Sequence, residues 1–335
     1  MSDGNARPGD GAPALSVVVV APNGFDQVRA TVEALAAQTV AGRIELVIVA
    51  ADGRVADAAA AHAGRFHSWR TVVRGPIDNV DVALAPSLPD CAADLVAPIE
   101  DHAFPEPDWA ERLLEVHREG GGGVGPAILN ANADSPMSWA NHLIAYGQWS
   151  ERVAEGPHAG PPIHNGAFAR RELEAIRERL PATWNREGEA IALMKRNGAT
   201  FRFAPRARIR HLSPSTLSAT AALRTDAGRL YAANRARTEG WGRGKRWAYA
   251  ASSPLIPLVR YARMRRELFA GAGAPSELRR GPWLLLGLAF DAAGQALGFA
   301  AGVGGARRRL ATFEMDRADH LNRADRRRFY PERVG

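Results

Sequence analysis

Three ionisable residues stand in a row at Glu100, Asp101 and His102, directly after the short apolar run of residues 95–99. On an extended chain, side chains two residues apart share a face, so we expect Glu100 and His102 to point one way and Asp101 the other. A carboxylate and an imidazole on a common face are half of a metal site. Acidic residues at a strand end are also common in solvated loops and in first turns of helices, so both interpretations stay open at this point.

The flanking residues place this acidic turn, residues 100–102, at the end of a strand. The run 95–99 has strand length, and Pro105 and Pro107 behind it are expected to stop the strand pairing. Pro107 suits the first turn of a helix that continues through Trp109. In open α/β sheets the carboxyl ends of the strands form the edge where ligands bind, so the acidic turn is expected at such an edge.

The composition describes a globular protein with a sizeable core. Of the 335 residues, 46% are hydrophobic and 24% are charged, which suits one large domain with an appendage. The net charge is +7, and the cations are almost all arginine, since Lys195 and Lys245 are the two lysines. An arginine excess suits phosphate or anionic lipid partners, but coding bias in an alanine- and arginine-rich proteome produces the same excess.

The cysteine content and the N-terminus bear on where the protein works. A single cysteine, Cys91, cannot form a disulfide or a cysteine metal cluster within one chain, which fits a reducing compartment. Residues 1–14 are small and polar and lack the apolar segment of a signal peptide, so we expect a disordered lead-in.

Residues 15–215 are predicted to form one α/β domain. The apolar runs 15–21 and 44–50 are β-branched without alternation, as expected of strands buried on both faces of a parallel sheet. A segment with helical spacing joins them, which makes a βαβ unit. From Asp134 the chain is loop-like and aromatic, and two short strands around Pro205 are expected to close the domain, at residues 200–204 and 207–211.

The C-terminal region, residues 216–335, is predicted to be helical and to associate with a membrane. Arginines alternate with leucine, isoleucine and valine over residues 255–269, which indicates a basic amphipathic helix on an anionic membrane surface. A solvated helix packed on the preceding domain is the alternative. Residues 282–304 are apolar, but Asp291, Gln295 and flanking arginines argue against a membrane span.

A stripe of small residues runs along this apolar segment. Gly294, Gly298 and Gly302 form a doubled G-x-x-x-G pattern on one helical face. Such a pattern predicts close helix packing, either within the chain or between chains as a homo-oligomer.

Taken together, these residues resemble the bacterial family-two glycosyltransferases with the GT-A fold. The likeness spans residues 15–211 and rests on four features in order: Pro22-Asn23 after the first strand, Asp52-Gly53 after the second, the acidic turn with its prolines, and the stretch from Asn165 through Glu189 to His211. It implies a Rossmann-like, mostly parallel sheet with helices on both faces. It also implies a nucleotide-diphosphate sugar donor, a divalent metal under the diphosphate, and inversion at the sugar during transfer to a glycan or lipid-linked acceptor.

The resemblance also implies roles for individual residues. Glu100 and His102 stand at the ends of the family's Asp-x-Asp motif and, with His211, would hold Mn²⁺ or Mg²⁺; imidazole ligands favour Mn²⁺. For His211 a loop histidine bonded to backbone is the alternative. Glu189 would be the catalytic base, although Glu187 stands two residues before it and a solvent-facing helix glutamate is the alternative. The residues expected to contact substrate are Pro22, Asn23, Asp52, Asp101, Asn165 and Gly166.

Two positions depart from the family pattern. Ala51 stands where the family has a first aspartate, so Asp52 alone would contact the nucleobase, and Ala190 follows Glu189 where an aspartate is usual. A non-catalytic nucleotide-sugar binding or scaffold relative is therefore the alternative to an enzyme working on the cytoplasmic face of the membrane. A nucleic-acid partner is not expected, because the chain has no nucleic-acid reading motif.

Overall fold

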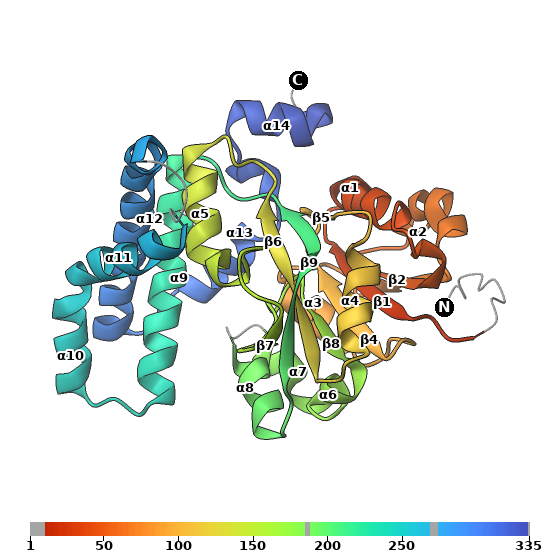
Figure 1. Cartoon of the computed structure of the whole chain (residues 1–335), viewed down its shortest axis with the longest axis horizontal. Coiled ribbons are helices and arrows are strands. Elements are labelled where there is room, and N and C mark those ends of the chain that lie inside the picture. Colours follow the sequence, from red (N-terminus) through yellow and green to blue (C-terminus); the bar gives the residue numbers. More distant parts are fainter. Residues whose placement is uncertain (1–10, 185–187, 269–273, 334–335) are drawn as a thin grey trace. The chain divides into compact units, whose positions relative to one another are not determined.

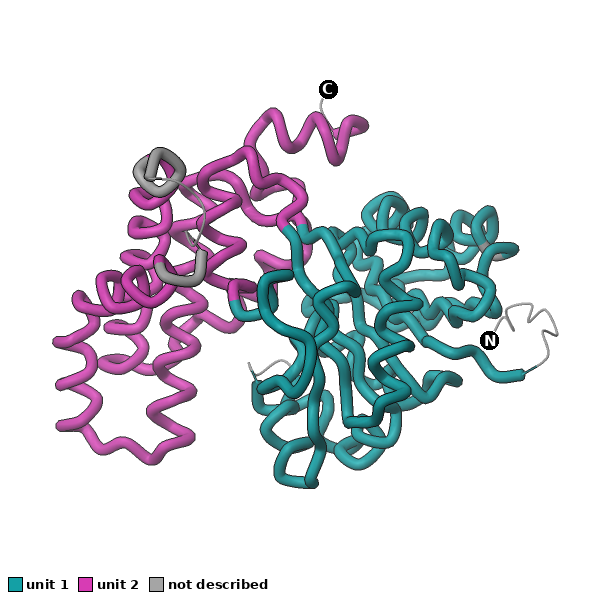
Figure 2. Tube along the Cα trace, in the orientation of Figure 1, with its two compact units in different colours: residues 1–129, 148–211 teal, residues 130–147, 212–335 magenta. Residues whose placement is uncertain are grey.

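The computed structural model describes residues 11–184, 188–268 and 274–333. The chain divides into two compact units (Figure 2), an α/β unit of residues 1–129 and 148–211 and a helical unit of residues 130–147 and 212–335. The units therefore change at residue 211, close to the expected position 215, but residues 130–147 belong to the helical unit. The expected disordered lead-in falls mainly on residues 1–10, which lie outside the described residues.

Within the described residues the α/β unit contains one mixed sheet of nine strands (Figure 1). Its parallel part has the order β3-β2-β1-β4, and β8, β6, β9 and β5 continue the sheet beyond β4, with β7 also paired to β9. The pairs β4 with β8, β6 with β8, and β9 with both β5 and β7 are antiparallel. The strands are β1 (Leu15–Ala21), β2 (Ile44–Ala50), β3 (Ser68–Val73), β4 (Leu95–Ile99), β5 (Ala103–Pro105), β6 (Gly123–Asn130), β7 (Gly156–His158), β8 (Ala167–Ala169) and β9 (Phe201–His211).

The centre of the sheet is covered on both faces. Every residue of β1, β2 and β4 is buried, as their mostly apolar sequences predict, and the two polar exceptions, Ser16 of β1 and Glu45 of β2, hydrogen-bond to each other. Val18 and Val20 pack in one cluster with Leu84 and Met194, from helices α3 (Val80–Leu84) and α8 (Glu189–Arg196). Alternate strand residues point to the opposite face, and α1 (Phe25–Ala36) contacts β1 without joining that cluster. The other helices of this unit are α2 (Arg54–Ala59), α4 (Trp109–His117), α6 (Arg170–Glu174) and α7 (Leu180–Thr183).

Three elements differ from the sequence expectations. The two short strands expected around Pro205 are one continuous strand, β9, because Pro205 lies between the part that pairs with β7 and the part that pairs with β5. Strand pairing also does not stop before Pro105, which is the last residue of β5 at the end of the strand order. The segment expected to be loop-like from Asp134 contains helix α5 (Pro136–Tyr146), whose first turn is capped by the Ser135 hydroxyl and begins with proline.

The helical unit is built around a long pair of helices. Helix α12 (Ala274–Ala301) packs along α9 (Leu217–Thr238), and α5, α10 (Arg243–Ser252) and α11 (Ile256–Leu268) also contact α12. Helices α13 (Ala306–Phe313) and α14 (Arg323–Phe329) complete the unit.

The predicted glycine stripe is the contact between α12 and α9. A Cβ placed on Gly294 would lie 2.0 Å from the Thr225 carbonyl oxygen, and one on Gly298 would lie 2.3 Å from that of Arg229. Close packing within the chain is therefore confirmed at these two positions. Gly302 serves differently, because it follows the last turn of α12 with φ of +75° and has nothing near its Cβ position.

Among the described residues, the helical stretch Arg279–Ala301 is long and apolar enough to cross a membrane, judged by length and composition alone. Half of its most apolar part, 50%, is buried inside the structure. Two polar residues in the middle of it, Asp291 and Gln295, are also buried, and Asp291 accepts hydrogen bonds from Arg260 at 2.8 Å and from Gln295 at 2.7 Å. The expectation that this segment does not span a membrane stays a prediction.

Candidate active site

The strand order places a ligand-binding edge beside β1 and β4. In the order β3-β2-β1-β4 the direction of chain progression reverses between β1 and β4, and open α/β sheets bind ligands beyond the carboxyl ends of strands at such a point. Strands β2, β1 and β4 run parallel and in register, so their carboxyl ends share one edge of the sheet. Pro22 and Asn23 follow β1 there, Asp52 follows β2, and Glu100 follows β4.

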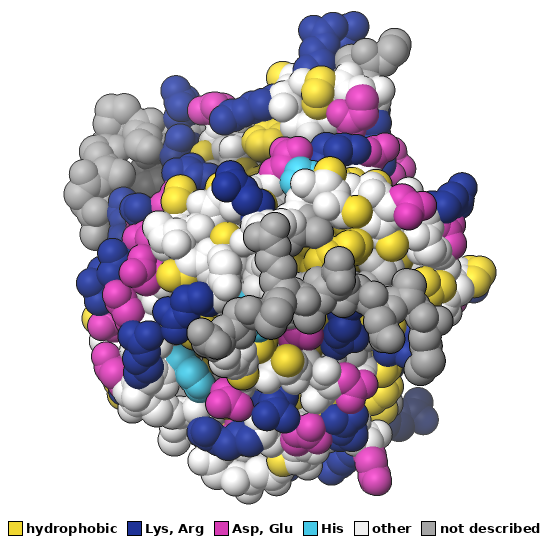
Figure 3. All heavy atoms as spheres, turned by 90° about the vertical axis from the view of Figure 1, so that its right-hand side faces the viewer, with side chains coloured by type: hydrophobic (Ala, Val, Ile, Leu, Met, Phe, Trp, Pro, Cys, Tyr) yellow, Lys and Arg dark blue, Asp and Glu magenta, His cyan; other side chains and the backbone are white. Residues whose placement is uncertain are grey.

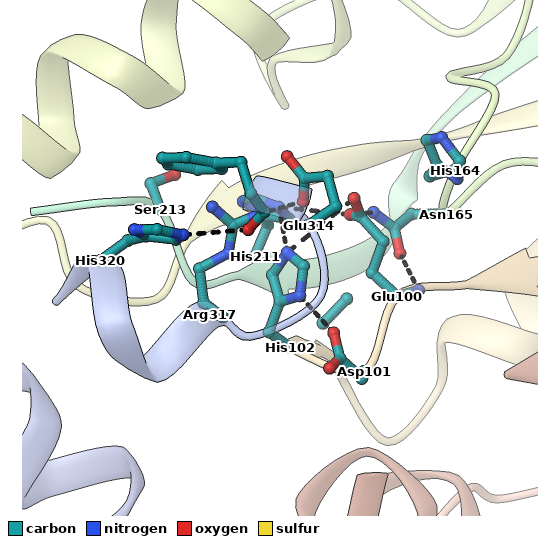
Figure 4. A network of polar contacts seen from close by, with 12 residues as sticks. Glu100, Asp101, His102, His164, Asn165, His211, Ser213, Glu314, Arg317 and His320 are labelled. Atoms are coloured by element: carbon teal, nitrogen blue, oxygen red, sulfur yellow. Dashed lines mark hydrogen bonds and ion pairs between the residues drawn. The ribbon is translucent and has the colours of Figure 1, made fainter. Parts of the chain in front are cut away.

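Glu100, His102 and His211 form a compact three-residue group (Figure 4), in which the ligand atoms lie within 4.8 Å of one another. The Nε2 atoms of the two histidines are 3.1 Å apart. Glu100 Oε2 lies 3.2 Å from Nε2 of His211, and Glu100 Oε1 lies 3.8 Å from Nε2 of His102. The structure therefore brings together the three residues that the sequence assigned to a metal.

Two elements supply this group. Glu100 and His102 belong to a turn after β4 rather than to extended chain, so the expected strand alternation is not what makes them converge. His211 is the last residue of β9, and the pairing of Ala103 with His211 between β5 and β9 holds it beside the acidic turn.

Burial and charge set the ionisation of Glu100. Its side chain is 15% exposed, and both imidazoles beside it are buried. Burial is the largest single influence and raises the pKa of Glu100, but the charges of His211 and His102, a hydrogen bond from His211 and the more distant His164 together hold that pKa well below its ordinary value. Glu100 is therefore anionic at neutral pH, as a carboxylate that binds a metal must be.

Asp101 orients His102 from the side opposite the cluster. Asp101 Oδ1 lies 2.5 Å from Nδ1 of His102, and because a carboxylate only accepts, the hydrogen is on Nδ1. In the neutral ring, Nε2 then carries the lone pair that faces Glu100 and His211. A carboxylate behind a histidine is a common support for a metal-ligating imidazole. The expected contact of Asp101 with substrate stays a prediction.

Asn165 holds Glu100 in place, and the next residue, Gly166, packs tightly against the chain at Pro162. Asn165 Oδ1 accepts from the Glu100 backbone N–H at 3.1 Å, and its Nδ2 donates to Glu100 Oε2 at 2.5 Å. Among the described residues Asn165 is the one non-glycine with positive φ, at 66°, a conformation that asparagine tolerates better than most residues. A Cβ on Gly166 would lie 2.3 Å from the Pro162 carbonyl oxygen, so only glycine fits there.

Two side chains from α1 support the acidic turn and were not anticipated. Gln27 Nε2 donates to Asp101, while its Oε1 accepts from the Asn23 backbone N–H at 3.2 Å. The Thr31 hydroxyl lies 2.8 Å from the Asp101 carbonyl oxygen. Both residues are buried. Their spacing of four indicates only that they share one face of α1, and no local sequence signal connects that face with the acidic turn.

The remaining predicted residues are near strand ends but outside this group. Pro22 is buried and Asn23 is exposed at the end of β1. The Asp52 carboxylate accepts from the Arg54 backbone N–H at 2.9 Å and from its Nε at 3.0 Å, and these hydrogen bonds lower the pKa of Asp52. Glu189 is the half-buried first residue of α8, and its role as a base stays a prediction. Glu187 lies outside the described residues.

The donor set of the three-residue group fits a divalent transition metal. Two imidazole nitrogens and one carboxylate oxygen converge, and each histidine can present the lone pair of a neutral ring. Imidazole suits Zn²⁺ or Fe²⁺ and is a better ligand for Mn²⁺ than for Mg²⁺, which prefers oxygen ligands in octahedral geometry. A metal held this way would keep coordination positions open for a substrate.

Charges of both signs are interspersed on the face of the molecule shown in Figure 3. Arginines and carboxylates alternate there rather than gathering by sign. The net charge of +7 is therefore not concentrated as a single basic patch on that face.

Comparison with known proteins gives a distant structural similarity. No protein-family model matches the chain, and no curated protein matches it. Three crystal structures of S. aureus TarS, a family-two glycosyltransferase with the GT-A fold, match at 10% sequence identity each. The first has a TM-score of 0.44 over 60% of this chain and 37% of that chain. TarS 1–349 with UDP has a TM-score of 0.45 over 65% and 64%, and with UDP-GlcNAc 0.39 over 48% and 47%. The chain thus spans less than two thirds of each matched TarS chain. Because the similarity is this distant, the function proposed below rests on the residues of the chain itself.

Proposed function

We propose that this protein is a metal-assisted, inverting glycosyltransferase that uses a nucleotide-diphosphate sugar as its donor and a glycan or lipid-linked acceptor. The observation that carries the proposal is the position of the three-residue group. Two histidines and an anionic glutamate converge where the strand order reverses, at the edge where open α/β sheets bind nucleotides.

The three-residue group suits a diphosphate leaving group. Glu100, His102 and His211 would hold a divalent cation, which when bound neutralises the charge that develops on the departing diphosphate. Asp101 and Asn165 keep His102 and Glu100 in their orientations, so little rearrangement is needed when a donor arrives. Burial of both imidazoles keeps competing water away from them.

The transfer itself needs a base on the face of the donor sugar opposite the leaving diphosphate. An acceptor hydroxyl attacks the anomeric carbon, its proton passes to a carboxylate, and the bond from that carbon to the diphosphate oxygen breaks. The products are an inverted glycoside and a nucleoside diphosphate. The proposal assigns the carboxylate to Glu189 at the start of α8, because inversion requires attack on the face opposite the leaving diphosphate, so a carboxylate that holds the metal cannot also be the base.

One observation favours the alternative of a non-catalytic nucleotide-sugar binding relative. The carboxylate of Asp52, the residue expected to contact the nucleobase, accepts hydrogen bonds from Arg54, and Ala51 precedes it where the family has a first aspartate. Such a protein would bind a donor without consuming it.

A thermal-shift screen of nucleotide sugars with and without Mn²⁺ tests binding, because a ligand of the folded state raises the melting temperature. Release of nucleoside diphosphate from the stabilising donor then tests turnover. We expect Mn²⁺-dependent stabilisation by at least one donor, and slow donor hydrolysis that His102→Ala abolishes. Stabilisation without release would favour the binding protein, and the absence of both would overturn the proposal.

A further inference from the structure

Helix α11 exposes an apolar stripe on the side away from the long helix α12. Leu255, Leu258 and Val259 are 60%, 64% and 49% exposed, and Ala262 is exposed one turn further on. Their spacing of three and four residues places them on one face of the helix. Residues between them face α12, since Arg260 pairs with Asp291 and the Tyr261 ring lies beside Gly281.

The neighbouring helix α10 adds a large exposed aromatic residue. Trp247 is 59% exposed, whereas the nearby Trp241 is buried against Phe299 of α12. Both α10 and α11 pack against α12 (Figure 1), and the three-residue helix Ser253–Leu255 joins them. The stripe and Trp247 thus belong to one continuous stretch of chain, residues 243–265. We call the exposed side chains of this stretch the basic apolar face.

The basic apolar face is charged with one sign only. Residues 243–265 contain five arginines and one lysine and no aspartate or glutamate. Arg260 is neutralised by Asp291, and Arg246 donates to the Phe299 carbonyl oxygen at 2.8 Å. Four further cations are exposed beside the apolar side chains: Arg243, Lys245, Arg263 and Arg265.

The combination of exposed apolar side chains with exposed cations indicates which kind of partner binds this face. A second copy of the chain would bring the same excess of exposed cations to a symmetric contact, and like charges across an interface oppose association. A nucleic acid would satisfy the cations but would leave the leucines in water. An anionic lipid bilayer satisfies both, because headgroups attract arginine and lysine while the acyl boundary takes up the apolar face of a surface helix.

We propose that the basic apolar face docks on an anionic lipid bilayer, with Leu255, Leu258 and Val259 inserted at the acyl boundary. Trp247 then lies at headgroup level, where tryptophan is favoured. The cations of α10 and α11 contact phosphate groups. The proposal places the protein peripherally on a membrane and does not depend on the function of the α/β unit.

Flotation of the full-length protein with vesicles tests the docking. Vesicles of phosphatidylcholine alone are compared with vesicles that also contain phosphatidylglycerol, at low and at high salt. We expect binding to the anionic vesicles only, weakened by salt because exposed charges are screened. Leu258→Asp and the double variant Arg263→Glu/Arg265→Glu should each lower vesicle affinity by about tenfold or more.

Matched controls come from other exposed positions. Leu217→Asp changes a leucine of α9 that is 52% exposed, and Arg196→Glu changes an exposed arginine of α8; both should bind vesicles like the wild type. The proposal is overturned if the wild type ignores anionic vesicles at low salt, or if the α11 variants bind as well as the controls. Sedimentation without lipid tests the other possible partner, a second copy of the chain. If the protein does not bind vesicles but forms a dimer that Leu258→Asp dissociates, this face is a self-association surface and the proposal is overturned. Donor hydrolysis by Leu258→Asp should stay at the wild-type rate, which separates this test from that of the proposed function.

Discussion

Replacing His211 by alanine removes the member of the three-residue group that comes from a different element. Glu100 and His102 lie in one turn, whereas His211 ends β9, so this substitution leaves the acidic turn and its supports from α1 and Asn165 untouched. The change also leaves the centre of the sheet intact, because His211 is the last residue of β9. A loss of metal binding would therefore report the ligand and not the fold.

The expected magnitude follows from the ligand count. Removing a group that merely supports a metal ligand commonly costs tenfold to a hundredfold in metal affinity, so removing one of three protein ligands should cost at least about tenfold, roughly 1.4 kcal/mol. Thermal stability without metal is a poor readout. The variant loses a buried imidazole, but it also deprives the Glu100 carboxylate of a partner at 3.2 Å, so a change in stability would combine both effects.

The assay is a titration of the full-length protein with Mn²⁺ alone, in which the electron paramagnetic resonance signal of free Mn²⁺ is followed. His117→Ala is the matched control, since His117 is a half-buried histidine at the end of α4 outside the group. The reasoning is refuted if His211→Ala binds Mn²⁺ as tightly as the wild type, or if the control loses as much affinity.

Three further predictions concern the base, the helix contact and the cysteine. Glu189→Gln should lower sugar transfer about a hundredfold to ten-thousandfold with donor affinity near wild type, while Glu187→Gln should do little; the reverse order in steady-state rates would reassign the base. Gly294→Ala should lower the free energy of unfolding by roughly 1–3 kcal/mol in a denaturant titration, because its Cβ would overlap α9. Gly244→Ala, in open space on α10, should instead raise it by about 0.5–1 kcal/mol; equal effects would contradict the packing argument. Burial, with the charge of a nearby glutamate, raises the pKa of Cys91 to about 12, so at pH 8 a thiol reagent should modify the native protein far more slowly than the unfolded chain, and equal rates would contradict the burial.

Much of the parallel sheet could be predicted from the sequence because its signals are local. The runs that became β1, β2 and β4 are apolar, β-branched and bounded by turn residues, and the observed strands match the predicted runs at both ends. The strands β5, β7 and β8 have three residues each, which is too short for any periodicity to appear. Their pairing depends on partners distant in the sequence.

The errors in the less regular half have physical reasons. The sequence pattern predicts that Pro205 ends a strand. A proline lacks the backbone N–H, but it is tolerated where one side of a strand is unpaired, and Pro205 lies between the part of β9 that pairs with β7 and the part that pairs with β5. Helix α5 was missed because its polar and aromatic side chains obscured the helical spacing, although Ser135 followed by proline is a recognised helix start.

The sequence predicted the three residues that converge in the group, but it did not predict the side chains from α1 that support the acidic turn. Glu100 and His102 were found from their spacing, and His211 was found through the resemblance to a glycosyltransferase family. The contacts of Gln27 and Thr31 with the acidic turn join residues about 70 positions apart, and no local pattern specifies which face of α1 meets that turn.

The central claim is that Glu100, His102 and His211 hold a metal beneath the donor diphosphate. Pulsed electron paramagnetic resonance of the full-length protein with Mn²⁺ and a nucleoside diphosphate, with the uridine and guanosine compounds run in parallel, tests it directly. The account predicts ¹⁴N couplings from imidazole ligands, reduced in His102→Ala, together with ³¹P coupling from the diphosphate on the same ion. Protein-bound Mn²⁺ with phosphorus coupling but only oxygen ligands from the protein would contradict it.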